Sequence, residues 1–354
     1  MSFEGFPIVV GLELTLACNL QCKHCASSAT RRTRNNELSL HELLAICDQF
    51  PDLFVQEVDL TGGEPLLRPE WIKVAEHLRK LGIDTRMVTN GILLRENAQQ
   101  LADSGIKTVG VSLDGLEETH DYIRKKSGLF KHIVSGIEAA LAKGVPIAII
   151  TAVNDTNIGQ LPALQSLLQE LGIEHWQLQP IFSLGRARDE AINLSNETYL
   201  ELGSYIRHLK TTCNTSAISI MPADGVGYFT DLDTRERAWK GCPAGISSCG
   251  ITSDGNVKGC LSLPDHFNEG NLREKDFWSI WFDDNSFAFN RQFSKSDLNG
   301  NCKDCNYGTQ CKGGCSVMSY SATGQLHNNP YCFHRLLDNG TAAYPTTIHA
   351  SHNT

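Results

Sequence analysis

Three cysteines near the start of the chain have the spacing of an iron–sulfur ligand set. Cys18, Cys22 and Cys25 follow one another in a CX3CX2C pattern. Thiolates this close lie on one short loop and can bind three irons of a [4Fe-4S] cluster, which leaves the fourth iron without a protein ligand. An open metal position lets a small molecule complete the coordination, as it does in other catalytic metal sites. The pattern therefore predicts a cluster that takes part in chemistry.

A second group of cysteines lies in the last third of the chain. Its members are Cys242, Cys249, Cys260, Cys302, Cys305, Cys311, Cys315 and Cys332. These thiolates suffice for two fully ligated [4Fe-4S] clusters, and equally for two zinc sites of four thiolates each. The chain has 13 cysteines, an odd number, and its first residues do not form a signal peptide, so a disulfide framework is not expected.

Composition limits the kind of protein and its surroundings. With 354 residues, of which 41% are hydrophobic, the chain can bury a large core. The net charge of -9 argues against broad binding to nucleic acid, which requires a basic surface. No stretch approaches the roughly 20 apolar residues that a membrane span needs. We therefore expect a cytoplasmic protein with neither nucleic acid nor membrane as a partner.

Short β-rich runs alternate with helical patterns up to about residue 180, which is typical of an α/β fold with parallel strands. The predicted strands are 8–14, 57–60, 84–88, 108–113, 146–153 and 175–179. The predicted helices are 39–49, 69–81, 95–104, 130–143 and 158–171. A further helix is predicted over 195–210, after a loop at 181–196, and a short one near 277–282.

In such an array, functional groups gather on the loops that follow the strands. The cysteine loop follows the first strand, and Thr61-Gly62-Gly63-Glu64-Pro65 follows the second. Thr89-Asn90-Gly91 follows the third strand, Ser112 and Asp114 end the fourth, and Asn154 follows the fifth. We therefore expect these groups to meet at one mouth of the array, where the carboxyl ends of the parallel strands lie.

These motifs together resemble those of radical S-adenosylmethionine (SAM) enzymes that carry a C-terminal SPASM domain. Beyond the first cysteines and Gly62-Gly63-Glu64-Pro65, the match includes Cys242-X12-Gly255-X4-Cys260, Cys302-X2-Cys305-X5-Cys311-X3-Cys315 and Cys332. The resemblance implies a partial (β/α)6 barrel of the TIM type, followed by a loop-rich, cluster-binding SPASM domain. The expected parts are a barrel core over 1–194, a helical bridge over 195–240, a SPASM domain over 241–335 and a tail over 336–354.

The resemblance also implies a set of cofactor-binding residues. Cys18, Cys22 and Cys25 would bind the catalytic cluster, whose open iron SAM would chelate. The residues expected to contact SAM are Gly62, Gly63, Glu64, Pro65, Ser112, Asp114, Arg124 and Asn154. Three [4Fe-4S] clusters are expected in all. The ligands implied for auxiliary cluster I are Cys242, Cys249, Cys260 and Cys315, and those for auxiliary cluster II are Cys302, Cys305, Cys311 and Cys332. Spacing alone would equally allow the cysteines from Cys302 to Cys315 to form a local site.

The activity implied is reductive cleavage of SAM to a 5′-deoxyadenosyl radical, which abstracts a hydrogen atom from the substrate. Full cysteine ligation of both auxiliary clusters favours a net oxidation of a ribosomally made peptide, such as a crosslink. The alternative is dehydrogenation or epimerisation of a small metabolite such as a sugar or aminocyclitol. In an epimerisation Cys213 is a candidate hydrogen-atom donor, and the other interpretation of Cys213 is an ordinary thiol. A zinc-stabilised binding protein without chemistry is the alternative from another class.

Partners follow from the same hypotheses. The substrate is a peptide or a small molecule, and the electron donor is expected to be of flavodoxin or ferredoxin type. Because Cys18 lies almost at the start of the chain, no fused leader-peptide-binding domain is expected. A peptide substrate would then need either a separate leader-binding protein or contacts from the SPASM region and the tail after Cys332.

Overall fold

The structure is a computed structural model of the chain, and it describes residues 5–212, 218–223, 226 and 239–338. Within these residues, none of the helices has both the length and the apolar character that crossing a membrane requires. Cys213 lies outside the described residues.

One sheet of ten strands runs through the molecule in the order β10-β9-β8-β1-β2-β3-β4-β5-β6-β7. Six strands form a continuous parallel array, and they confirm the predicted strands to within two residues at each end. They are β1 (Val9–Thr15), β2 (Glu57–Gly62), β3 (Asp84–Thr89), β4 (Thr108–Ser112), β5 (Ile147–Val153) and β6 (His175–Pro180). At one edge β7 (Ser219–Pro222) pairs parallel with β6.

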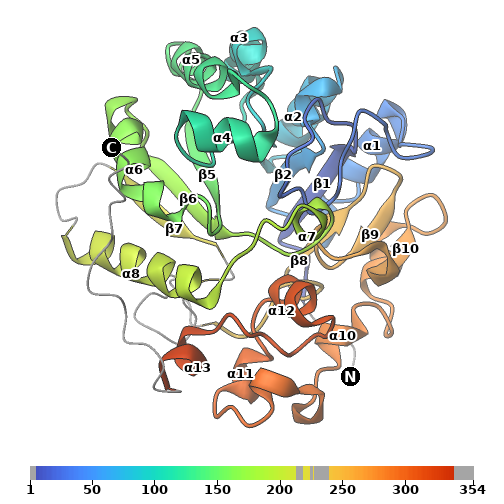
Figure 1. Cartoon of the computed structure of the whole chain (residues 1–354). Coiled ribbons are helices and arrows are strands. Elements are labelled where there is room, and N and C mark those ends of the chain that lie inside the picture. The colour runs from blue at the N-terminus through green and yellow to red at the C-terminus, as the bar shows by residue number, and fades with distance from the viewer. Residues whose placement is uncertain (1–4, 213–217, 224–225, 227–238, 339–354) are drawn as a thin grey trace.

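The other edge of the array is completed by the C-terminal region, by which we mean residues 239–338. Strand β8 (Ser248–Ile251) pairs parallel with β1, and β9 (Asn256–Lys258) and β10 (Asn268–Asn271) continue antiparallel beyond it. Strands β7 to β10 were not predicted, because each has only three or four residues, too few for a readable alternation. Figure 1 shows β8 to β10 beside β1, with the other C-terminal elements below the barrel.

Helices flank the parallel strands on the outside, as Figure 1 shows for α2, α3, α5 and α6. The first helices are α1 (Leu40–Cys47), α2 (Trp71–Lys80), α3 (Leu94–Ser104), α4 (Glu117–Arg124), α5 (Leu129–Leu141) and α6 (Leu161–Glu170). The α1 helix starts at a capping box in which Ser39 and Glu42 bind each other's backbone N–H groups. Helix α3 ends at Gly105 with a φ of 82°, a conformation that glycine adopts without strain. All of these except α4 were predicted.

Beyond β6 the chain becomes rich in loops, as predicted. The remaining α-helices are α7 (Arg186–Asp189), α8 (Asn196–Thr212), α9 (Phe277–Trp281), α10 (Ala288–Arg291), α11 (Gly308–Cys311), α12 (Ser316–Thr323) and α13 (Phe333–Asp338). The short 3-10 helices are η1 (Pro51–Leu53), η2 (Pro65–Leu67), η3 (Ile158–Gln160), η4 (Asp265–Phe267), η5 (Lys295–Asp297) and η6 (Gly300–Cys302). The prediction of an unbroken loop over 181–196 was wrong, because α7 lies inside it.

A single hydrophobic core joins the barrel to the C-terminal region. Leu12 and Leu14 of β1 belong to the same buried cluster as Phe277 and Trp281 of α9. The Phe50 ring packs edge-on against Phe277, with ring centroids 5.9 Å apart. Sheet and core therefore both continue from the barrel into the C-terminal region, whereas the exact domain boundaries stay a prediction.

Candidate cluster and cofactor site

The cysteine loop leaves the end of β1 and is held there by the loop that follows β2. The Gly63 N–H donates to the Thr15 carbonyl at 2.8 Å, and the Glu64 N–H donates to the Ala17 carbonyl at 2.9 Å. A Cβ on Gly62 would overlap the Thr15 carbonyl oxygen, and one on Gly63 would overlap that of Ala17. Both glycines are therefore needed for the close approach of two chain segments, a reason that the sequence analysis did not consider.

A second segment, after β6, holds the cysteine loop from its other side. The Arg186 Nε donates to the Cys22 carbonyl at 2.9 Å, and its Nη1 donates to the Ala29 carbonyl at 2.7 Å. The Arg186 N–H donates to the Cys25 carbonyl at 3.1 Å. The loop's backbone thus has partners from the segment after β6. Arg186 lies in the segment predicted as a loop over 181–196, and no role was predicted for it.

Glu64 is completely buried and connects the ends of β2 and β3. Its Oε1 accepts from the Thr89 hydroxyl at 2.8 Å and from the Leu66 N–H at 3.1 Å, and its Oε2 accepts from the Asn90 N–H at 2.8 Å. Burial raises the pKa of this carboxyl, whereas the hydrogen bonds lower it. A carboxylate has about four acceptor positions, so Oε2 can still accept one donor.

Asn90 reaches from the end of β3 to the first cysteine. Its side-chain carbonyl accepts from the Ile92 N–H at 3.0 Å, which fixes the amide group. The amide nitrogen donates to Asn19 Oδ1 at 2.8 Å and lies 3.7 Å from Cys18 Sγ. The side chain therefore presents an N–H group to a predicted cluster ligand. Only its position at the mouth had been predicted.

Asp114 and Arg124 form a buried ion pair beside the second cysteine. Asp114 Oδ2 lies 2.8 Å from Arg124 Nε and 2.7 Å from its Nη2, and Asp114 Oδ1 accepts from the Ala152 N–H at 3.0 Å. The third guanidinium nitrogen, Nη1, lies 3.9 Å from Cys22 Sγ. Burial by itself would raise the pKa of Asp114, but the Arg124 charge together with His24, His120 and the Ala152 hydrogen bond brings the pKa to about 2. The pair is therefore ionised at neutral pH.

Two histidines lie beside the Asp114–Arg124 ion pair. His24 Nε2 lies 3.4 Å from Asp114 Oδ2, and His120 Nδ1 accepts from the Asp114 N–H at 3.1 Å. Burial lowers the pKa of both imidazoles to about 4, so both are neutral at pH 7. His24 Nδ1 and His120 Nε2 are buried without a hydrogen-bond partner among the described residues. Neither histidine was predicted; His120 and Arg124 share a face because they lie four residues apart in α4.

The other predicted SAM contacts have different surroundings. Asn154 is buried and uses its side chain in a local turn, where it accepts from the Thr156 N–H at 2.9 Å and donates to the Ala152 carbonyl at 3.0 Å. Ser112 is half-buried at the end of β4, and Pro65 is buried at the start of η2. The structure thus brings Glu64, Asp114 and Arg124 to the cysteine loop.

The cysteines of the C-terminal region fall into two groups and one separate residue. Burial raises the pKa of Cys260 and Cys315, and the neighbouring Cys242 raises both further. In the second group, burial raises the pKa of Cys332 to about 11, with smaller contributions from Cys302 and Cys305. Cys311 belongs with these, because Cys332 and Cys302 contribute to raising its pKa, after burial, to about 12.

Cys249 is the separate residue. It lies in β8 opposite Val10 of β1, in the hydrophobic core. Burial raises the pKa of its thiol, and the charged group that acts on it is Arg291 rather than another cysteine. The family resemblance had implied that Cys249 binds auxiliary cluster I with Cys242, Cys260 and Cys315.

Within the described residues, no three His, Cys, Asp or Glu side chains lie close enough together to share a single metal ion. A [4Fe-4S] cluster is bulkier than one ion and holds its thiolates further apart.

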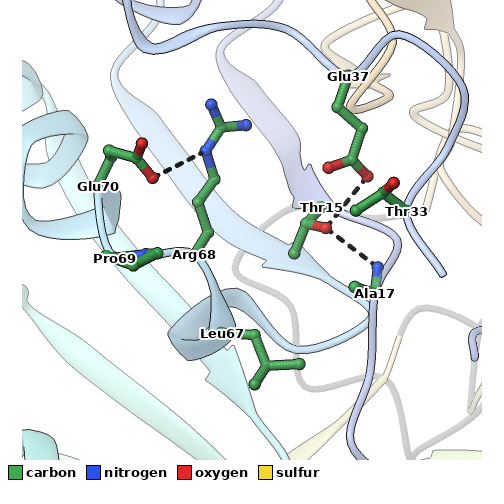
Figure 2. Close-up of a pocket in the computed structure, with 8 residues that line it drawn as sticks. All are labelled: Thr15, Ala17, Thr33, Glu37, Leu67, Arg68, Pro69 and Glu70. Carbon is green, nitrogen blue, oxygen red and sulfur yellow. Dashed lines mark hydrogen bonds and ion pairs between the residues drawn. The ribbon is translucent and has the colours of Figure 1, made fainter. Parts of the chain in front are cut away.

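Two pockets lie in the described part of the chain. One, of about 310 Å³, is beside the cysteine loop and is lined by Thr15, Ala17, Thr33, Glu37, Leu67, Arg68, Pro69 and Glu70. Figure 2 shows these residues. The other has about 630 Å³ and lies in the C-terminal region, where Phe267, Phe289 and Tyr320 contribute to its wall. No cysteine and no predicted SAM contact lines either pocket.

Comparison with known families finds two matches. Residues 12–168 match the radical SAM superfamily, and residues 242–306 match the SPASM iron–sulfur cluster-binding domain. Both matches agree with the motifs and with the order of the two regions along the chain.

Similar proteins include an AdoMet-dependent heme synthase from Methanosarcina barkeri, 32% identical over 95% of this chain and 99% of that protein. The mycofactocin maturase MftC from Mycobacterium tuberculosis is 29% identical over 89% of this chain and 79% of that protein. Among solved structures, Streptococcus suis SuiB bound to S-adenosylmethionine has a TM-score of 0.75 and 20% identity, over 93% of this chain and 78% of SuiB. The SuiB likeness supports the fold, including the partial barrel.

Proposed function

This chain belongs to the radical SAM superfamily and carries a SPASM domain, and we propose that it uses SAM to modify an iron tetrapyrrole related to heme. The observation that carries the proposal is the likeness to the AdoMet-dependent heme synthase, which extends over 99% of that protein and therefore includes both regions. A tetrapyrrole substrate was not among the hypotheses drawn from the sequence.

The catalytic cluster is proposed to be held by Cys18, Cys22 and Cys25. When bound, a [4Fe-4S] cluster with an open iron supplies the electron that cleaves SAM to methionine and a 5′-deoxyadenosyl radical. Glu64 would accept a hydrogen bond from the SAM amino group with the remaining acceptor position of Oε2. The hydrogen bonds from Thr89, Leu66 and Asn90 hold that carboxylate in one orientation.

The other predicted SAM contacts differ in the hydrogen bonds that their side chains already make. Ser112, half-buried at the end of β4, stays a proposed contact. Gly62, Gly63 and Pro65 would act through the backbone of the loop after β2. Asn154 is a weaker candidate because its side chain stabilises a turn. Asp114 and Arg124 already bind each other, so we propose that they act mainly through the cluster loop.

Two auxiliary clusters are proposed in the C-terminal region, which makes three [4Fe-4S] clusters in all. Cys242, Cys260 and Cys315 would bind auxiliary cluster I. Cys302, Cys305, Cys311 and Cys332 would bind auxiliary cluster II. Cys249 is not proposed for the first set, because Arg291 and no other cysteine contributes to the pKa of its thiol. One iron of auxiliary cluster I would then have no cysteine ligand.

The proposed reaction is a net oxidation of the substrate. Removal of a hydrogen atom from an aliphatic side chain leaves one unpaired electron on the substrate carbon. Removal of that electron, together with a proton in a dehydrogenation, completes a two-electron oxidation. An auxiliary cluster is the proposed electron acceptor, and a flavodoxin- or ferredoxin-type protein is the proposed donor for SAM cleavage.

The test is an anaerobic assay of the reconstituted enzyme with SAM, a chemical reductant and iron tetrapyrroles that differ in their side chains. We expect 5′-deoxyadenosine to form in proportion to a modified tetrapyrrole, measured by mass spectrometry. Deuterium on the reacting side chain should appear in the 5′-deoxyadenosine. If no tetrapyrrole is altered and none raises SAM cleavage, the substrate class is wrong.

Peptide modification is the second candidate, and the likeness to the mycofactocin maturase MftC favours it. Peptides encoded beside the gene would then give a product two mass units lighter, with or without a separate leader-binding protein. Epimerisation of a small metabolite would leave the mass unchanged and introduce solvent deuterium at one carbon.

Metal analysis of anaerobically purified protein tests the cluster count. Three [4Fe-4S] clusters require about twelve irons per chain, with matching sulfide. Stoichiometric zinc with little iron would favour the zinc-stabilised binding protein instead.

A further inference from the structure

We propose that the Arg124–Asp114 pair tunes the reduction potential of the cluster bound by Cys18, Cys22 and Cys25, with the guanidinium favouring the reduced state and the carboxylate opposing it. This proposal rests on the ligand assignment of the proposed function and not on its substrate. Arg124 and Asp114 are here positioning residues that act through the cluster.

The geometry places a positive charge at a ligand sulfur. Arg124 Nη1 lies 3.9 Å from Cys22 Sγ, while Nε and Nη2 are held by Asp114 Oδ2 at 2.8 and 2.7 Å. The guanidinium is planar and cannot lose its proton, so the bidentate contact with Asp114 also sets where Nη1 points. Asp114 is itself held by the Ala152 N–H at 3.0 Å.

The charges are buried, so water screens them weakly. The side chains of Arg124 and Asp114 are 7% and 1% exposed. Reduction adds one negative charge to a cluster, and cluster potentials depend on the net charge and on hydrogen bonds to the sulfurs. A guanidinium at the sulfur therefore raises the potential, and a carboxylate near it lowers the potential.

Arg124 is the member of the pair that reaches the ligand sulfur, with Nη1 3.9 Å from Cys22 Sγ. Asp114 Oδ2 binds the other two guanidinium nitrogens. Because Coulomb interaction weakens with distance, we expect the guanidinium to act on the cluster more strongly than the carboxylate.

The alternative role for Arg124 is the SAM carboxylate contact that the family resemblance implies. Two of its three nitrogens are bound to Asp114 and the third faces Cys22, which favours a role that exists before SAM arrives. A measurement without SAM separates the two roles.

The test is an anaerobic redox titration of the reconstituted full chain without SAM. The reduced clusters are measured at each potential by electron paramagnetic resonance. The triple variant Cys18→Ala, Cys22→Ala, Cys25→Ala supplies the auxiliary-cluster signal that is subtracted. For Arg124→Gln we expect the reduction equilibrium constant to fall about tenfold, which for one electron is a midpoint about 59 mV lower. Asp114→Asn should shift the midpoint upward, and the double variant should lie between the two.

Arg124→Lys keeps the positive charge and should stay closer to the wild-type midpoint than Arg124→Gln. Unchanged midpoints in iron-loaded Arg124→Gln and Asp114→Asn would overturn the proposal, as would shifts of both in the same direction. If Arg124→Gln cannot hold iron, the other two variants test the proposal. An upward shift of the midpoint in Asp114→Asn with a near-wild-type midpoint in Arg124→Lys would support it, and the absence of that shift would overturn it. The titration needs no substrate, so a failed tetrapyrrole assay leaves its outcome unaffected.

Discussion

Arg273 in the C-terminal region binds Glu42 in the first turn of α1, with Nε 2.6 Å from Oε1 and Nη2 3.2 Å from Oε2. Glu42 Oε2 also accepts from the Ser39 N–H at 2.7 Å, which closes the capping box of α1. The same carboxylate thus caps the start of a barrel helix and also binds the C-terminal region.

This contact makes part of the stability depend on pH. The Arg273 hydrogen bond, followed by those from Ser39, lowers the pKa of Glu42 from 4.5 to about 2. The stabilisation is therefore complete above about pH 4.5 and is lost as the pH falls towards 2. Both side chains are about a third exposed, so the contribution is at most about 1 kcal/mol.

Urea unfolding of wild type and Glu42→Gln measures this contribution. The difference in unfolding free energy should be present at pH 7 and smaller at pH 3. Glu117→Gln is the matched control, because its ion pair with Lys131 is more exposed. A Glu42→Gln difference that grows as the pH falls would contradict the prediction.

Gly63→Ala should displace the cysteine loop. Its Cβ would overlap the carbonyl oxygens of Leu16 and Ala17, just before Cys18. We expect iron content to fall by about four per chain, measured by iron and sulfide analysis. Gly136→Ala in α5 is the control, since its Cβ would meet ordinary contacts from 3.5 Å and alanine favours a helix by up to about 1 kcal/mol. Equal iron content in both variants would count against the role of Gly63.

Cys249→Ala should leave the iron content unchanged, whereas Cys315→Ala should lose about four irons per chain. The reason is that Cys242 and Cys260 both raise the pKa of the Cys315 thiol, whereas the charged group that acts on the pKa of Cys249 is Arg291. Iron analysis of anaerobically reconstituted variants checks this. Loss of four irons from Cys249→Ala would restore it to the ligands of auxiliary cluster I.

Glu64→Gln should weaken SAM binding and lower stability. A glutamine amide group would present a donor to the Asn90 N–H or to the Thr89 hydroxyl and Leu66 N–H, leaving buried donors unpaired at about 1–3 kcal/mol. Equilibrium binding of SAM and urea unfolding measure the two effects. Glu70→Gln is the control, because Glu70 is 41% exposed and only approaches Arg68 at 3.7 Å. Wild-type affinity in Glu64→Gln would remove Glu64 from the proposed site.

The parallel array could be predicted from sequence because each strand is a β-rich run followed by a helix with its own start or stop signal. Gly82, Gly105, Gly144 and Gly172 follow α2, α3, α5 and α6, and all have positive φ, which is typical of glycine at a helix end. The loops that follow these strands could therefore be placed at one mouth. Local patterns were sufficient for this part of the fold.

The remaining features depend on contacts between distant segments. Strand β8 has four residues, and its pairing with β1 has no local signal. Cys249 is one of the regularly spaced cysteines, but in the structure it lies in β8 within the hydrophobic core. The contacts of Asn90 with Cys18 and of Arg124 with Cys22 arise only when loops from different strands meet.

The pairing of β8 with β1 has a consequence for how the protein is made. Chains emerge from the ribosome with the N-terminal part first, so β1 must wait for residues 248–251 before its second edge is covered. Until then the strand that leads into Cys18 exposes unpaired backbone groups, which invite aggregation. A barrel fragment ending before β8 would keep that edge open. Expression of the two regions as separate proteins should therefore fail, and insertion of the first cluster should succeed best after synthesis is complete.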